Sequence, residues 1–139
     1  MVQTLVGGFL VVHGLITTMI GVVTITSPSA PALAMPSWLS WWPGPFGRSW
    51  LFEAVNVGSG VAVAGGLLWL AAGVVLVIGG LGWIGVPALT DLKVPVLVTG
   101  ASLGLVALAL YFHPFYLVGV LINLALIVLL WGRLAPAGS

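Results

Sequence analysis

The stretch VPVLVTGASLGLVALALYFHPFYLVGVLINLALIVLLWG, residues 94–132, decides the fold of this chain. It contains 39 residues without one charged side chain. A single helix of that length would reach about 58 Å, nearly twice the roughly 30 Å of a bilayer's hydrocarbon core. His113-Pro114 divides the stretch, because a residue before proline is pushed away from helical geometry. The sequence therefore predicts two antiparallel membrane spans, over 94–112 and 115–131.

The rest of the chain is almost as free of charge. Charged residues make up 4% of the sequence, whereas soluble domains carry about 25%. Three Lys and Arg cannot form the basic patch of a nucleic-acid binder, and the absence of cysteine excludes disulfides, thiol redox chemistry and thiolate metal sites. We therefore predict an all-α polytopic membrane protein, one domain over 1–139, with the lipid bilayer as a partner and no nucleic acid. The five charged residues are Arg48, Glu53, Asp91, Lys93 and Arg133.

Two further spans precede the deciding stretch. The first covers about 4–26; its apolar run is longer than that of a signal peptide and follows no Lys or Arg, so we expect it to be retained. The second covers about 50–80, either as a strongly tilted helix or with a bend at Gly58-Ser59-Gly60. The loop over 27–49 is rich in Pro and Trp. Because Trp prefers the headgroup boundary, we expect this loop to lie on the bilayer surface. The expected interfacial anchors are Trp38, Trp41, Trp42 and Trp50.

Lys and Arg placement predicts the orientation. With both termini in the cytoplasm, Lys93 and Arg133 lie inside and Arg48 lies outside, whereas the reverse places one inside and two outside. The excess of positive charge on the inner side favours the first arrangement. We expect an integral protein of the bacterial cytoplasmic (inner) membrane.

Polar residues inside apolar spans are candidates for function. His13 lies near the middle of the first span, with Thr17 one turn later on the same face. Asn123 lies at a similar depth in the last span. These residues are expected either to make polar contacts between helices or to bind a ligand such as a pigment, a haem or a substrate.

A second polar group is expected at the outer face. Arg48, Glu53 and Asn56 surround the start of the second span, and His113 lies in the turn between the last two spans. The four are expected to form either a solvated helix end with an Arg–Glu pair or a site for a ligand or a proton, and His113 taken alone is more often a turn residue that precedes a proline. No hydrolase or phosphate-binding motif occurs, and the two acids lie on opposite faces, so we do not expect an enzyme. We expect no set of metal ligands, and the sequence does not indicate a cofactor.

Short motifs recur in order along the chain. They are His13-Gly14, Gly47-Arg48-Ser49-Trp50-Leu51, Leu67-Leu68-Trp69-Leu70-Ala71, Ser102, His113-Pro114, Gly119 and Ile122-Asn123. On these motifs the chain resembles a group of small four-helix bacterial membrane proteins for which no activity is established. The resemblance implies that His13, Arg48, His113 and Asn123 belong to a shared design. His13-Gly14 alone is also similar to DoxX-type four-helix proteins.

Three functions follow as hypotheses. The first is a non-catalytic accessory or structural subunit that packs against other membrane-protein subunits, favoured by small residues such as Gly100 and Gly104 at GxxxG spacing. The second is a binding or transport protein for a small molecule, lipid or quinone, which acts by self-association. The third is a pigment- or haem-associated subunit that uses a transmembrane histidine. The ligand, the partners and the oligomeric state are not indicated by the sequence.

Overall fold

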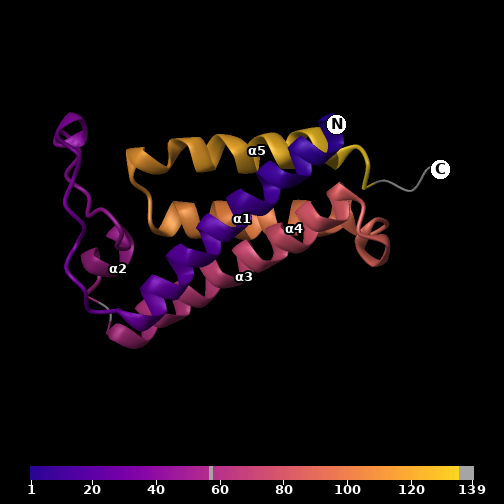
Figure 1. Ribbon diagram of the computed structural model, residues 1–139. Helices are drawn as coiled ribbons and strands as arrows, with labels where there is room; N and C mark the ends of the chain where they lie inside the picture. Colours follow the sequence, from indigo (N-terminus) through magenta and orange to yellow (C-terminus); the bar gives the residue numbers. More distant parts are fainter. Residues whose placement is uncertain (57, 135–139) are drawn as a thin grey trace.

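The computed structural model describes residues 1–56 and 58–134, and within them it is helical with no strand. This confirms the predicted all-α class with four helices long and apolar enough to cross a membrane. Short 3-10 turns lie between the helices, and Figure 1 shows the arrangement. The elements are α1 (Val2–Thr26), η1 (Ser37–Leu39), α2 (Trp50–Ala54), α3 (Ser59–Ile84), η2 (Pro87–Leu89), α4 (Lys93–Leu110), η3 (Pro114–Tyr116) and α5 (Leu117–Trp131).

Each long helix packs against its neighbours in the sequence. α1 lies against α3, α3 against α4, and α4 against α5. In Figure 1, α1 crosses the bundle obliquely, and its beginning lies near the end of α5. We call this the turn end, because residues 85–92 connect α3 to α4 there. The opposite end, which carries residues 27–56 and the turn 111–116, is called the loop end.

The expected helix over 50–80 is replaced by two separate helices. α2 ends at Ala54 and α3 begins at Ser59. Between them Asn56 has a positive φ of 50°, a left-handed conformation that interrupts a right-handed helix, and Gly58 is extended before α3. The bend expected at 58–60 is thus a break just before Ser59. α3 still has 26 residues and a length of about 39 Å, so it must tilt to fit the bilayer.

Six glycines set the contact between α1 and α3, and we call them the glycine ladder. They recur every seven residues on each helix and face one another in antiparallel order. A Cβ added to Gly14 would lie 2.7 Å from the Val77 backbone nitrogen and 2.8 Å from the Gly73 oxygen, so only glycine permits this approach. A seven-residue repeat keeps one seam of two supercoiled helices in contact. The facing pairs are Gly7 with Gly80, Gly14 with Gly73, and Gly21 with Gly66.

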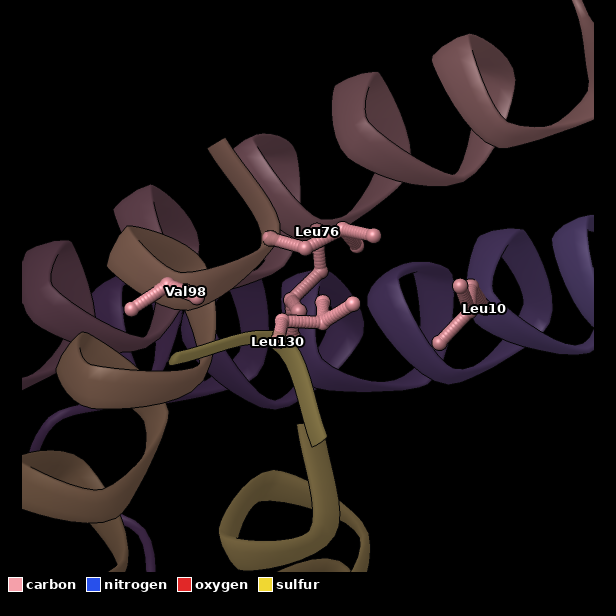
Figure 2. Packing of buried hydrophobic residues seen from close by; sticks show 5 residues of the cluster. Leu10, Leu76, Val98 and Leu130 are labelled. Atoms are coloured by element: carbon pink, nitrogen blue, oxygen red, sulfur yellow. The ribbon is translucent and has the colours of Figure 1, made fainter. Parts of the chain in front are cut away.

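A leucine cluster joins the four long helices toward the turn end. Figure 2 shows Leu76 of α3 and Leu130 of α5 together between Leu10 of α1 and Val98 of α4. Leu76 and Leu97 are fully buried in it. Because lipid is as apolar as leucine, such a cluster stabilises the bundle through close van der Waals packing rather than through the exclusion of water.

Candidate functional site

A cavity of about 460 Å³ opens at the loop end. Its walls come from the end of α1, the loop after it, α2, the start of α3 and the residue that follows α4. Polar and apolar side chains alternate around it, and we call it the loop-end cavity. Its lining residues are Val23, Thr24, Ser27–Pro31, Leu33, Gly47–Ser49, Phe52, Glu53, Asn56, Gly58, Ser59, Ala62 and Tyr111.

Two opposite charges meet in this cavity. Arg48 Nε lies 2.8 Å from Glu53 Oε1, and both side chains are about two-fifths exposed, at 42% and 38%. Both residues line the cavity, and they are the only charged residues among the first 90 of the sequence. The predicted Arg–Glu pair therefore forms, and it forms on the wall of a cavity. The other three charged residues, Asp91, Lys93 and Arg133, lie at the turn end, so Arg48 and Glu53 are the two that the loop end carries.

Local capping explains how α2 holds the pair. The Ser49 hydroxyl caps α2 by accepting a hydrogen bond from the Phe52 backbone N–H at 3.2 Å, and it donates one to the Leu110 carbonyl at 2.6 Å. The Trp50 indole N–H donates to the Ala109 carbonyl at 2.9 Å. Both carbonyls belong to the last turn of α4, where helix carbonyls have no partner within the helix. These bonds fasten α2 to α4, so one turn of α2 brings Glu53 beside the preceding arginine.

Asn56 joins the pair, but His113 does not. Asn56 lines the cavity just after α2. His113 is fully buried, and its ring centre lies 4.9 Å from that of Phe46. Its Nδ1 accepts a hydrogen bond from the Phe115 backbone N–H at 3.2 Å, and burial lowers the pKa of the imidazole. The structure thus separates the expected cluster of four, because the turn before Pro114 uses His113 as the cap of η3.

Ser49 and Tyr111 are cavity residues that were not among the expected site residues. Ser49 borders the cavity while it caps α2, and Tyr111 closes the cavity from the end of α4. The Tyr111 hydroxyl donates to the Ala62 carbonyl at 3.4 Å, and burial raises the pKa of this phenol. The sequence could have indicated Ser49, because serine is a favoured cap residue at the start of a helix. Nothing in the sequence predicts that Tyr111 contacts Ala62, 49 positions earlier.

The mid-span polar residues lie inside the bundle. Thr17 is buried and donates to the His13 carbonyl at 2.9 Å, a bond within its own helix. Asn123 is 2% exposed and packs against Gly104, whose added Cβ would lie 3.0 Å from the amide nitrogen. The Asn123 side chain also reaches His13 across the bundle. Their geometry falls short of a standard hydrogen bond, since His13 Nε2 and Asn123 Oδ1 both lack a partner. The role of His13 as ligand or packing residue stays a prediction.

The four tryptophans expected at the bilayer surface all lie at the loop end. Trp38 and Trp41 are 67% exposed and Trp50 is 43% exposed. Trp42 is partly covered and packs edge-on against Phe112, with ring centres 5.4 Å apart. Exposed indoles at one end of an apolar bundle are typical of interfacial anchors. Their contact with headgroups stays a prediction.

Comparisons with known proteins do not assign the chain to a family. No family model, no curated protein and no solved structure matches the chain. The resemblance to small four-helix bacterial proteins and to DoxX-type proteins rests on the quoted motifs alone. Within residues 1–56 and 58–134, no three His, Asp or Glu side chains are grouped so that they could hold a metal ion. The chain is an integral membrane protein, because four of its helices are apolar and long enough to span a bilayer.

Proposed function

We propose that this protein binds a small polar ligand in the loop-end cavity and acts as a binding or transport protein rather than as an enzyme. The observation that carries the proposal is the placement of Arg48 and Glu53, opposite charges on the wall of one cavity in a chain nearly without charge. A volume of about 460 Å³ falls within the roughly 300–1,000 Å³ of small-molecule sites. Glu53 has no second carboxylate beside it to share acid–base work.

The lining also fits a ligand with a polar head and some apolar surface. Ser27 and Ser59 offer hydroxyls, and Phe52 and Leu33 offer apolar contacts. Among the described residues, neither of these hydroxyls makes a hydrogen bond within the chain. A ligand could therefore form bonds without displacing internal ones.

Native mass spectrometry of the purified protein tests this proposal. Protein extracted in mild detergent should retain a bound molecule, and Ser27→Trp, which fills the cavity, should lose it. Lys93→Ala changes a charge at the turn end and should retain the molecule. Equal retention by Ser27→Trp would place the ligand elsewhere, and wild-type protein that binds nothing from a panel of polar metabolites and lipids would refute the proposal.

A second candidate is the accessory subunit of a larger membrane complex. Thr99 and Ser102 lie on the exposed face of α4, where a lipid-facing helix would more usually carry large apolar residues. Small and hydroxyl-bearing residues are enriched where membrane helices contact one another. Mild extraction from native membranes, followed by sizing and identification of companions, tests this role. A companion lost when both residues become leucine would support it, and a particle of this chain alone would refute it.

We also propose the orientation with both termini in the cytoplasm of a bacterium, which places the loop-end cavity outside. The absence of cysteine makes the test clean, because each introduced thiol is the only one. Ser29 at the loop end and Ala88 at the turn end are both exposed. An impermeant maleimide added to whole cells should label Ser29→Cys and not Ala88→Cys. The reverse pattern would invert the orientation.

A further inference from the structure

We infer that the ligand of the loop-end cavity is zwitterionic, with an anionic phosphate or carboxylate and a primary ammonium on one small head. This inference rests on the proposed function, because it assumes that the cavity binds a ligand. It goes further by naming the chemical class and by assigning one charge of the ligand to each of two residues. Arg48 binds the anion and Glu53 binds the ammonium.

The first argument is the charge balance of the cavity. Arg48 and Glu53 are its only charged lining residues, and they neutralise each other at 2.8 Å. A purely anionic ligand would meet Glu53 beside the arginine, and a purely cationic ligand would meet Arg48 beside the glutamate. Like charges at such distances oppose binding. A zwitterion pairs with both residues at once and leaves no charge without a partner.

The second argument is the geometry of the ion pair. The contact joins Nε of Arg48 to Oε1 of Glu53, which is the side edge of the guanidinium and one carboxylate oxygen. The end of the guanidinium, with Nη1 and Nη2, is the fork that binds phosphate and carboxylate with two parallel hydrogen bonds. The Oε2 oxygen can accept a hydrogen bond from an ammonium. The zwitterion can therefore bind without breaking the existing pair.

The third argument is that other polar residues border the cavity and that the cavity lies at one end of the bundle. Asn56 and the hydroxyls of Ser27 and Ser59 border the same cavity and can bond a phosphate ester or an ammonium. The cavity is lined by the end of α1, by α2 and by the start of α3, so it lies at the loop end of the membrane-spanning helices, the end that also carries the loop with the exposed Trp38 and Trp41. A zwitterionic phospholipid head and a free small zwitterion share the required chemistry. Phosphoethanolamine is the simplest group that presents it in both forms.

Binding measurements on the full chain in mild detergent test the inference. The probes are short-chain phosphatidylethanolamine, short-chain phosphatidylglycerol and free phosphoethanolamine, measured by isothermal titration calorimetry. We expect at least one ethanolamine probe to bind at least tenfold tighter than the phosphatidylglycerol. Tight binding by the lipid alone identifies a lipid head, and equal binding by free phosphoethanolamine identifies a soluble zwitterion; both results support the inference.

Two variants assign the charges. Glu53→Gln is nearly isosteric and should remove the preference for ethanolamine over glycerol, because only the partner of the ammonium is lost. Arg48→Gln should weaken both ethanolamine probes at least tenfold. Asp91→Asn and Lys93→Gln, at the turn end, should change neither, and circular dichroism with gel filtration checks that all variants fold.

The outcomes separate this inference from the proposed function. Phosphatidylglycerol that binds wild-type protein as tightly as the ethanolamine probes would overturn the zwitterion and leave a ligand site. An ethanolamine preference that survives Glu53→Gln would also overturn it. If the native ligand found by mass spectrometry occupies the cavity but carries no ammonium, the inference fails while the proposed function stands. If no probe binds and no native ligand is found, the proposed function fails.

Discussion

The glycine ladder makes a quantitative prediction about Gly14→Ala. The added Cβ would lie 2.7 Å from the Val77 backbone nitrogen and 2.8 Å from both the Gly73 oxygen and the Val77 side chain. Ordinary contact begins at 3.4 Å, so α1 and α3 must separate there by about 0.7 Å. Two of the three obstructing atoms are backbone, which cannot rotate away. Overpacking of this kind costs about 1–3 kcal/mol.

Gly8→Ala is the matched control. It lies on the same helix, and its Cβ would meet nothing within 4 Å. Both substitutions gain the same helix propensity, up to about 1 kcal/mol, so the difference between the two variants isolates the collision. Gly119→Ala adds a second control, because its Cβ would make ordinary contacts at 3.7 Å. Because contacts at that distance involve no collision, we expect Gly8→Ala and Gly119→Ala to retain at least the stability of wild type and Gly14→Ala alone to lose stability.

The assay is unfolding by sodium dodecyl sulfate in a mild detergent, followed by far-ultraviolet circular dichroism. The midpoint for Gly14→Ala should fall below that of wild type and below that of Gly8→Ala by an amount equivalent to about 1–3 kcal/mol. Variants with the same midpoint would show that α1 does not approach α3 at Gly14. The antiparallel register of the glycine ladder would then be refuted.

Three further predictions concern the turn and the polar contacts. Ser49→Ala removes the α2 cap and the bond to α4, so thermal unfolding should show a loss of about 1–2 kcal/mol; an unchanged midpoint would contradict the fastening of α2. Burial lowers the pKa of His113, so at acidic pH the unfolded chain binds a proton at this imidazole more readily than the folded chain does. The free energy of unfolding should therefore fall as the pH drops below about 6.5, by at most about 1.4 kcal/mol per pH unit. His113→Asn keeps an acceptor for the Phe115 N–H and should remove part of that fall, and an unaltered pH profile would exclude His113 as a source. Asn123→Leu should cost about 0.6–2 kcal/mol by leaving His13 without its polar neighbour, and a double-mutant cycle with His13→Leu that shows no coupling would contradict the contact.

The four spans could be predicted because charge and hydropathy act over whole segments. A long uncharged run has few alternatives in a bilayer, since every backbone group must be bonded within a helix. His113-Pro114 also predicted the separation of the last two spans, which end and begin around residues 111–116. The break before Ser59 was only one of two alternatives, because it depends on a single left-handed residue, Asn56, that no hydropathy pattern signals.

The register of the helices was harder to predict. Glycine recurs every seven residues on α1 and on α3, yet the chain has 20 glycines and many spacings occur among them. The ladder becomes visible only when one helix is laid against the other in antiparallel order. The GxxxG at Gly100 and Gly104 was expected to pack either within the bundle or against a partner subunit, and both glycines pack within the bundle, Gly100 against Leu76 of α3 and Gly104 against Asn123 of α5.

The candidate site divides in the same way. Arg48 and Glu53 are five residues apart, so their pairing follows from one helical turn and could be predicted. Tyr111 and Ser27 are far apart in the sequence. They meet at the cavity because α1 and α4, which end beside them, both pack against α3. His113 was assigned to the cluster because it lies at the same end of the bundle. Its position along the membrane normal could not show whether the side chain lines a cavity or caps a turn inside the bundle.

The stability of the bundle does not explain why this chain carries charge at the loop end. An exposed Arg–Glu pair contributes about 0–1 kcal/mol, and neutral polar residues could end a helix equally well. Helix α2 is already capped by Ser49 and fastened to α4 by bonds that involve neither charge. What Arg48 and Glu53 alone supply is a pair of opposite charges on a cavity wall. The proposed role in ligand recognition would account for that placement, whereas the stability that an exposed ion pair adds, about 0–1 kcal/mol, gives little reason for it.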